Sequence, residues 1–335
     1  MENILSGDGF TALTPDLVLA GVEKALESSL SNLCRPMNSY INRVYELADE
    51  DGEACIAKFY RPSRWSRDAL REEHDFLIEL ARAEIPVVAP LKLANGTTLA
   101  EVAGIPFALF PKRGGRIVDE YSDDQWLELG RLLGRVHAVG AGRSTRHRLI
   151  MAPEQSTREQ ITFLFAHGRI PVEFQDRFAK ITGAILDAAS PLFAGTESIR
   201  LHGDCHAANL IYRPGESFFI IDFDDMCMGP PIQDIWMLLP DTPEKCLPEL
   251  DLLLEGYESF RDFSRSSLRL IEPLRAMRFI HYMAWCAHQV MEDGHSVIMP
   301  DFGTHAYWQA ELADLEDQLA RINDAAAGGF PVFPH

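Results

Sequence analysis

The sequence predicts an α+β fold with two lobes, a first lobe built on a small antiparallel sheet and a second lobe that is mostly helical. Strand-like stretches separated by turns dominate the first part of the chain, whereas apolar residues recur at helical spacing in the second. Between them, residues 111–116 are proline, glycine and basic residues without periodicity. A chain of 335 residues is long enough for both lobes. The expected divisions are an N-terminal lobe at 1–111, a hinge at 112–116, a helical C-terminal lobe at 117–327 and a tail at 328–335.

The first lobe is predicted to combine two helices with about five strands. Thr14 and Pro15 are residue types preferred at a helix cap and in a first turn, which places a helix from there to about residue 29. An acidic turn that ends in Gly52 separates the next two strands. The other elements are predicted as strands at 39–47 and 54–60, a helix at 66–83, and strands at 87–93, 98–102 and 106–110. One antiparallel sheet is expected to hold these strands.

The second lobe is predicted to be a set of helices interrupted by one hairpin. Ser122 and Gln125 form a capping-box pattern, and the apolar residues of 126–136 follow at helical spacing. We expect His137, near the end of this helix, to be packed rather than catalytic. The other elements are predicted as helices at 157–167 and 171–188, strands at 210–213 and 217–221, and helices at 244–262, 266–292 and 304–324.

Composition argues against membrane and secreted proteins. No run of about 18 apolar residues without charge occurs, so we expect no membrane-spanning helix. The N-terminus lacks a basic region followed by an apolar stretch, so no secretory signal is expected. The six cysteines are scattered without the spacing of a disulfide framework. This distribution favours free thiols in a reducing cytoplasm.

The formal net charge is −19, which is unfavourable for contact with nucleic acid backbones. We therefore expect no nucleic acid partner. A surface of this kind could attract a cationic ligand, or it could be an ordinary acidic surface without a steering role. The charge alone leaves both interpretations open.

The stretch 201–209 carries the residues best suited to chemistry. It reads Leu-His-Gly-Asp-Cys-His-Ala-Ala-Asn, so Asp204 and Asn209 lie five residues apart, and Asp222 follows the second hairpin strand. Phosphoryl transfer needs a carboxylate that accepts the proton of the acceptor hydroxyl, and oxygen ligands that hold Mg²⁺ against the phosphates of ATP. Asp204 fits the first role, and Asn209 and Asp222 fit the second. Protein kinases use H-R-D-x-x-x-x-N and a later D-F-G, where this chain has H-G-D-x-x-x-x-N and D-F-D.

This stretch also has two simpler interpretations. Asp and Asn near a glycine are common turn formers, and His202, Cys205 and His206 could form a metal cluster. A turn alone does not explain the downstream Asp222 at the end of a strand. The cluster lacks the paired C-x-x-C or H-x-x-x-H spacing of a zinc site. Phosphoryl transfer is therefore the favoured interpretation.

Residues of the first lobe are candidates for binding the nucleotide. Lys58 lies in a mostly apolar strand, where it could merely snorkel at a sheet edge, but it also matches the V-A-I-K lysine that binds ATP phosphates. Such a lysine needs a carboxylate to position it. Glu73 is the candidate and Glu72 the alternative, although either could be surface charge. No G-x-G-x-x-G precedes the lysine. The hairpin tip instead offers Asn38 and Ser39, which could donate hydrogen bonds to phosphates or simply form a polar turn.

Together these motifs resemble the aminoglycoside phosphotransferase and choline kinase-like branch of the protein kinase-like fold, and more closely the bacterial stress response kinase A family. The resemblance spans roughly residues 12 to 320. The segments that carry it are 38–40, 42–45, 58–62, 72–74, 201–209, 222–225, 229–230, 233–234, 236–239 and 271–278. Ala208 stands where many relatives of this fold have glycine, a mild change that should leave the loop geometry intact.

The resemblance implies a bilobal, cytoplasmic and monomeric serine/threonine protein kinase that uses Mg²⁺ and ATP in bacterial stress protection. Residue by residue, it implies Asp204 as proton acceptor, Asn209 and Asp222 as Mg²⁺ ligands, Ser39 as the lid contact to ATP, and Lys58 with Glu73 as the phosphate-binding pair. It further implies that Asp234 braces the catalytic loop. Asp224 and Asp225 could assist with the metal or the acceptor.

Three functions are compatible with these residues. The favoured one is a protein kinase that transfers the γ-phosphoryl group of ATP to Ser or Thr. The second is a small-molecule kinase for an amino alcohol, a homoserine-like compound or an aminoglycoside, because the catalytic residues do not encode the acceptor. The third is a pseudokinase that only presents a surface to partners. Filled catalytic positions argue against the third.

Overall fold

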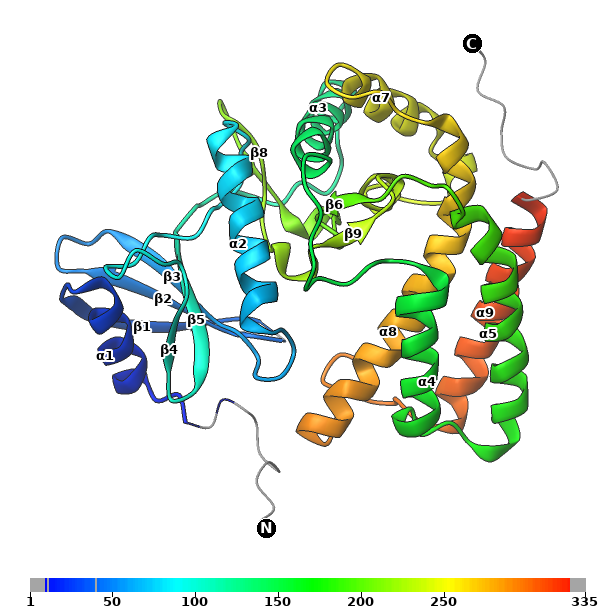
Figure 1. Cartoon of the computed structure of the whole chain (residues 1–335), viewed down its shortest axis with the longest axis horizontal. Helices are drawn as coiled ribbons and strands as arrows, with labels where there is room; N and C mark the ends of the chain where they lie inside the picture. Colours follow the sequence, from blue (N-terminus) through cyan, green and yellow to red (C-terminus); the bar gives the residue numbers. More distant parts are fainter. Residues whose placement is uncertain (1–9, 11, 40, 326–335) are drawn as a thin grey trace.

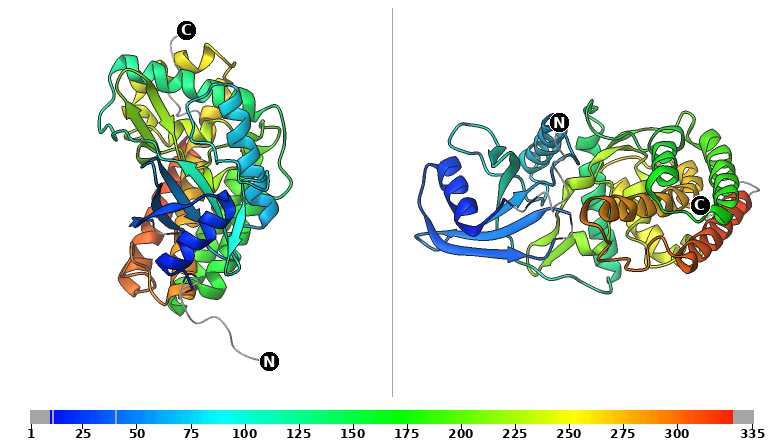
Figure 2. Two further views of the ribbon diagram at one scale, coloured as in Figure 1. Left: turned by 90° about the vertical axis from the view of Figure 1, so that its left-hand side faces the viewer. Right: turned by 90° about the horizontal axis from the view of Figure 1, so that it is seen from below.

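The computed structural model describes residues 10, 12–39 and 41–325, and these form two lobes (Figure 1). A sheet lies at one end of the molecule and a group of long helices at the other, an arrangement that Figure 2 shows from two further sides. The predicted α+β fold is confirmed, whereas the exact boundaries of lobes and hinge stay predictions. The tail expected at 328–335 lies outside the described residues. Within the described ranges, every helix is too short or too polar to span a membrane.

The N-terminal lobe is a five-stranded antiparallel sheet in the order β1-β2-β3-β5-β4. Its elements are α1 (Pro15–Leu26), β1 (Leu30–Met37), β2 (Arg43–Asp49), β3 (Ala54–Phe59), α2 (Arg67–Arg82), β4 (Ala100–Val102) and β5 (Ile105–Pro111). Both helices start at a side-chain cap, because Thr14 and Ser66 accept hydrogen bonds from backbone N–H groups three residues on. The buried rings of Phe59 and Phe107 stack at 4.9 Å and join β3 to β5. Helix α2 lies between this sheet and the C-terminal lobe (Figure 1).

One strand prediction in this lobe is wrong, and one strand is missing from the predictions. Residues 87–93 form no strand, and Val87 makes only a single bridge to the other lobe. Pro86 and Pro90 interrupt this segment, and proline has no N–H to donate to a sheet. Conversely, strand β1 is absent from the predictions because Pro36 disturbs its pattern. The structure tolerates this proline because β1 is an edge strand of the sheet.

The C-terminal lobe consists of helices around two short strand pairs, β6–β9 and β7–β8. Its longer helices are α3 (Asp123–Gly140), α4 (Arg158–His167), α5 (Val172–Phe193), α6 (Ile232–Trp236), α7 (Leu247–Glu258), α8 (Ile271–Asp293) and α9 (His305–Asp324). The strands are β6 (Ile199–Leu201), β7 (Leu210–Arg213), β8 (Ser217–Ile220) and β9 (Cys227–Gly229). Single helical turns are η1 (Pro153–Thr157), η2 (Ala207–Asn209), η3 (Phe223–Asp225), η4 (Pro243–Lys245) and η5 (Arg265–Leu270). The predicted hairpin and long helices are confirmed, whereas β6 and β9 are too short to show a period.

Two apolar cores hold the helices of this lobe. The first lies between α2, α3, α7 and the β7–β8 hairpin, and the second joins α4, α5, α8 and α9 around the fully buried Trp308. The predicted motif stretch 201–209 touches the first core, because its Cys205 is among the buried members. The loop that carries Asp204 is therefore anchored on a packed interior rather than on a free surface.

Helices α3 and α7 approach closely through glycines. A Cβ atom added to Gly130 of α3 would lie 2.0 Å from the carbonyl oxygen of Leu253 in α7, and one added to Gly256 would lie 2.1 Å from that of Leu127. Contacts this short are impossible without moving backbone. The spacing of these two helices, and with it the first core, requires glycine at both positions.

Replacing Gly130 by alanine should therefore destabilise the protein, although alanine is the better helix former. We expect the free energy of unfolding in urea to fall by about 1–3 kcal/mol, as in other overpacked interfaces. Gly183 of α5 is the matched control, because an added Cβ atom there meets nothing within 4 Å. Gly183→Ala should be neutral or stabilising by up to ~1 kcal/mol. Equal effects of the two substitutions would contradict the packing argument.

Candidate active site

The loop after β6 is held by Asp234 of α6. One carboxylate oxygen of this residue accepts the backbone N–H of His202 at 2.8 Å, and the other accepts that of Gly203 at 2.9 Å. The same carboxylate lies 3.1 Å from Nε2 of His137, whose Nδ1 lies 3.1 Å from the hydroxyl of Tyr257. All of these polar atoms are buried. His137 is thus packed, as predicted, and Asp234 occupies the bracing position that the sequence resemblance implies.

Gly203 allows the chain to turn sharply just before Asp204. Its φ is +86°, in the left-handed region that glycine adopts most easily, and an added Cβ atom would lie 2.2 Å from the carbonyl oxygen of Asp225. The side-chain amide of Gln233 donates a hydrogen bond to the carbonyl of Gly203 at 3.0 Å. These contacts fix the backbone that presents Asp204.

The carboxylate of Asp204 is held between two cationic or potentially cationic groups. Its Oδ1 lies 2.7 Å from the guanidinium of Arg278 in α8, and its Oδ2 lies 3.4 Å from Nε2 of His206. Burial alone would raise the pKa of Asp204, but the contact with His206 and the charge of Arg278 outweigh it and hold this pKa well below its usual range. The same contact raises the pKa of His206. Asp204 is therefore a carboxylate at neutral pH.

Asn209 and Asp222 lie on the two sides of the β7–β8 hairpin. The side-chain nitrogen of Asn209 donates to the backbone carbonyl of Asp204 at 2.9 Å, which leaves its amide oxygen as the atom that it can offer to a cation. Asp222 has φ 61° and ψ 64°, a costly conformation for a residue with a Cβ atom, and such residues cluster at functional sites. Nε2 of His202 bonds the carbonyl of Ile221 at 2.8 Å and so ties the catalytic loop to the residue before Asp222.

Lys58 of β3 brings the N-terminal lobe to this site. Its Nζ lies 2.8 Å from Asp222 and 3.1 Å from Asp224, across the two lobes. Burial would lower the pKa of Lys58, but the charges of Asp222 and Asp224 outweigh burial and raise this pKa well above its usual value. The ammonium is thus fully protonated. Both residues were predicted at the nucleotide site, and the structure brings them together across the lobes.

The expected contact between Lys58 and Glu73 is replaced by a different pair. The buried carboxylate of Glu73 in α2 binds the guanidinium of Arg148, which also donates to the carbonyl of Asp224 at 2.7 Å. Arginine competes well for such a carboxylate because its fork of N–H groups serves several acceptors at once. Glu72, the alternative candidate, instead accepts backbone N–H groups of the loop at 146–147. Glu73 is therefore connected to the site indirectly, because Arg148 binds both Glu73 and the backbone of Asp224.

The hairpin tip, which was predicted to contact the nucleotide, adds few contacts to the site. Asn38 is exposed and Ser39 is half-buried at the end of β1, and their contacts with a nucleotide stay predictions. Asn42, which sequence reasoning missed, is buried instead. Its amide nitrogen donates to Asp224 at 3.1 Å, and its oxygen accepts the N–H of Arg61 at 3.0 Å.

Three arginines complete the site, and none of them was predicted to do so. Arg64 binds Asp224 and Asp225 at 2.6 Å each, Arg148 is described above, and Arg278 binds Asp204. Burial would raise the pKa of Asp224, but Lys58, Arg64 and Asn42 outweigh it and lower this pKa. Each arginine is distant in sequence from its partner, so no local spacing could reveal the pairs. The one sequence feature that could have indicated such an arginine is the charged and aromatic stretch of α8, which contains Arg278.

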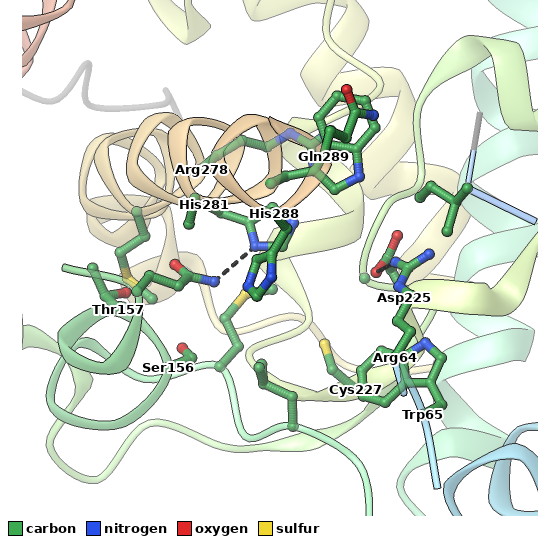
Figure 3. Close-up of a pocket in the computed structure, with 18 of the residues that line it drawn as sticks. Arg64, Trp65, Ser156, Thr157, Asp225, Cys227, Arg278, His281, His288 and Gln289 are labelled. Atoms are coloured by element: carbon green, nitrogen blue, oxygen red, sulfur yellow. Dashed lines mark hydrogen bonds and ion pairs between the residues drawn. The ribbon is translucent and has the colours of Figure 1, made fainter. Parts of the chain in front are cut away.

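A cavity of about 310 Å³ opens beside Asp204, between the segment after β3, the turn η1 and helix α8. Figure 3 shows Arg64 and Asp225 on one side and Arg278, His281 and His288 of α8 on the other. Gly203 and Arg278, the neighbours of Asp204, belong to its wall. The cavity thus lies next to the loop that carries Asp204, although Asp204 itself does not line it.

The residues fit a magnesium nucleotide on chemical grounds. Asn209 offers an amide oxygen, Asp222 offers a carboxylate that is 53% exposed, and Lys58 offers a protonated amine. Oxygen ligands of this type suit Mg²⁺. No group of three or more His, Cys, Asp or Glu side chains in the described part of the chain is arranged to hold a metal ion. His202, from the alternative cluster, is engaged with Ile221 and the N–H of Asp204.

Comparison with known proteins agrees with this geometry. The family described as "Phosphotransferase enzyme family" matches residues 34–271. The chain is 38% identical over 290 residues to "Serine/threonine protein kinase RdoA" of Salmonella typhimurium, covering 86% of this chain and 88% of the relative. It is 36% identical over 319 residues to "Stress response kinase A" of Escherichia coli, covering 94% and 95%. Among solved structures it is similar to amicoumacin kinase hAmiN in complex with AMP-PNP, Ca²⁺ and Ami, with a TM-score of 0.70, 20% identity and coverage of 91% and 93%.

The bracing role of Asp234 can be tested by stability. Asp234→Ala should lower the free energy of unfolding by about 3 kcal/mol or more, because two buried N–H groups of the loop and His137 lose their acceptor. Asp317→Ala, on the exposed face of α9, is the control and should change it by less than ~0.5 kcal/mol. Urea denaturation followed by circular dichroism measures both. A loss no larger than that of the control would mean that other contacts hold the loop.

Proposed function

The chain belongs to the phosphotransferase enzyme family, and within it to the stress response kinase A proteins, and we propose that it is a Mg²⁺- and ATP-dependent serine/threonine protein kinase with Asp204 as its base. As a member of this family it is a phosphotransferase acting on hydroxyl groups. The acceptor class, the metal and the role of Asp204 are the proposed parts. One observation supports them most strongly. Gly203 and Arg278, which flank Asp204, line a cavity, and Asn209 donates a hydrogen bond to the backbone carbonyl of Asp204, while Lys58 pairs with Asp222 near the same loop.

Asp204 would act on the acceptor hydroxyl. A hydroxyl group bound in the cavity would donate its hydrogen bond to the free lone pairs of this carboxylate, which orients the oxygen for attack and takes up its proton as the new bond forms. Because Arg278 and His206 hold the carboxylate in its charged form, it needs no deprotonation before it acts. The hydrogen bond with Asp204 raises the pKa of His206, so this imidazole keeps its positive charge to a higher pH than an ordinary histidine.

Lys58, Asn209 and Asp222 would bind the nucleotide side. The amide oxygen of Asn209 and the carboxylate of Asp222 are the ligands proposed for Mg²⁺, and the Lys58 ammonium would contact phosphate oxygens. When bound there, Mg²⁺ would offset the negative charge of the phosphates. Ser39 and Asn38 would cover the phosphates from the hairpin tip, and Glu73 would support Lys58 indirectly, through Arg148 and Asp224.

A protein acceptor is favoured because a relative that matches over most of both chains is named a serine/threonine protein kinase. The same relatives support a place in the bacterial stress response. A small-molecule kinase is the second candidate, favoured by the enclosed cavity beside Asp204. A pseudokinase is disfavoured, because Asp204, Asn209 and Asp222 are all present. We further propose a monomeric, cytoplasmic enzyme, in keeping with six free cysteines.

The proposal predicts that Asp204→Asn abolishes transfer but not nucleotide binding. Transfer of labelled γ-phosphate from ATP to a generic Ser/Thr protein, or to pooled amino alcohols and aminoglycosides, should fall by about 10²–10⁴-fold. The amide keeps the size of the side chain but cannot accept the proton. Label on protein supports the protein kinase, and label only on a small molecule supports the second candidate.

Nucleotide binding is the control for this experiment. Asp204→Asn should bind Mg-ATP as the wild type does in calorimetry, whereas Lys58→Ala and Asp222→Ala should bind it more weakly. Normal turnover by Asp204→Asn would exclude this residue as the base. Unchanged affinity in both other variants would exclude the proposed nucleotide site.

The pair between Arg278 and Asp204 predicts a shift in pH dependence. Asp204 acts as a carboxylate, so activity is lost as the pH falls through its pKa, which Arg278 keeps low. Arg278→Gln removes that charge and raises this pKa, so the acid limb of the kcat/KM profile should move up by about 1–3 pH units. Arg275→Gln, one turn earlier on α8, should leave the limb in place. If the profile of Arg278→Gln is unchanged, the acid limb does not report the titration of Asp204.

A further inference from the structure

The cavity beside Asp204 is where the proposed function would place the acceptor, and the charged side chains of its wall are all engaged in ion pairs. Lys58, Asn209 and Asp222, the proposed nucleotide ligands, do not line it. Its described wall carries three arginines and two carboxylates: Arg61, Arg64, Arg278, Asp225 and Glu292. A ligand in the cavity would therefore lie near the loop of Asp204, away from the proposed nucleotide ligands, and would contact a wall that carries both positive and negative side chains.

Each carboxylate of this wall already has an arginine partner. Arg64 lies 2.6 Å from Asp225, and Arg61 lies 2.9 Å from Glu292 and 3.3 Å from Asp293. The third arginine, Arg278, pairs with Asp204, so the carboxylate proposed as the base is paired as well. A cationic ligand would have to displace one of these arginines to reach a carboxylate, and displacement leaves a partly buried guanidinium without its partner.

The remaining polar groups of the wall are neutral. Burial lowers the pKa of both His281 and His288, so both imidazoles are uncharged at neutral pH. The side-chain amide of Gln160 lies 2.7 Å from Nδ1 of His281 and can only donate there, which leaves Nε2–H as a donor. Gln289 adds another neutral amide. Such groups recognise hydroxyl, amide and carbonyl groups without requiring charge.

The rest of the wall is apolar, and the cavity is small. The apolar side chains are those of Ile41, Trp65, Leu149, Met151, Leu274, Met277 and Trp285. A volume of about 310 Å³ is at the lower end of the usual range for ligand pockets. A compact group with an apolar face fits it better than a large polycation.

We propose that this cavity selects a hydroxyl acceptor without positive charge, in the form of a Ser or Thr side chain with uncharged neighbours, and that it disfavours amines, aminoglycosides and basic peptides. The inference rests on the proposed phosphoryl transfer and specifies its acceptor. It also decides between the two meanings of the net charge of −19. In this proposal the net charge does not attract the acceptor, because the carboxylates of the cavity wall are already paired with arginines.

The first test is transfer of labelled γ-phosphate from Mg-ATP to three peptides that differ only in the residues flanking one serine. Alanine and leucine flanks should give a kcat/KM about tenfold or more above lysine flanks, a difference that corresponds to ~1.4 kcal/mol. N-acetylserinamide and kanamycin are offered as a neutral and a cationic small molecule. Preference for lysine flanks, or efficient labelling of kanamycin, would overturn the inference. Label on N-acetylserinamide but on no peptide would show that the acceptor is a small molecule rather than a protein. The preference for an uncharged acceptor would still be supported.

The second test does not depend on turnover. Arg61→Gln frees Glu292 and Asp293 at the cavity, so kanamycin should bind about tenfold tighter than to wild type in calorimetry. Arg61→Lys keeps the charge and should behave as wild type. Arg67→Gln, which frees Glu101 on the outer surface, is the matched control and should also behave as wild type. If Arg61→Gln and wild type bind kanamycin with the same affinity, the ion pairs do not set this preference.

Discussion

The carboxylate of Asp234 decides where the catalytic loop lies. A buried carboxylate is costly unless hydrogen bonds satisfy it, and here two backbone N–H groups and the ring of His137 do so. Because the two N–H groups belong to His202 and Gly203, their positions depend on helix α6 rather than on strand β6, which has only three residues. Gly203 must then adopt a positive φ to pass the carbonyl of Asp225. These contacts fix the backbone position of Asp204, and its carboxylate lies beside Arg278.

The two lobes meet through charged pairs in addition to the apolar core that α2 shares with α3, α7 and the β7–β8 hairpin. Lys58 and Arg64 of the N-terminal lobe bind Asp222, Asp224 and Asp225 of the C-terminal lobe, and Arg61 binds the end of α8. Asp224 is fully buried and receives Lys58, Arg64 and Asn42 at once. Removing one partner from such a buried group is costly, about 3–5 kcal/mol in other proteins. The charged contacts of the candidate site are therefore also contacts between the lobes, so Lys58 pairs with Asp222 and Asp224 only when the lobes are together.

The sequence predicts those parts of the site that are close in the chain. Asp204, Asn209 and Asp222 are linked by one loop and one hairpin, so their spacing alone places them together. Lys58 is predictable because its strand and its motif agree. The arginines are not, since Arg64 and Arg278 meet carboxylates from distant segments and any of 31 basic residues has the right chemistry. The same limit explains Glu73, which was predicted to pair with Lys58 but pairs with Arg148. Strand β1 was missed for another reason, because a proline that excludes a central strand is acceptable at a sheet edge.

The contacts of Lys58 assign separate roles to the two aspartates that it binds. Asp222 is 53% exposed on a strained backbone, whereas Asp224 is 5% exposed and has two other donors. A nucleotide phosphate can draw Lys58 away from the exposed carboxylate at little cost, because water and a metal ion can replace the ammonium there. It cannot do so at the buried one without leaving a charge partly unpaired. In the proposed site, Asp224 would thus be the fixed carboxylate that positions Lys58, a role that the sequence predicts for Glu73. Glu73 supports it from behind, because Arg148 joins Glu73 to the backbone of Asp224.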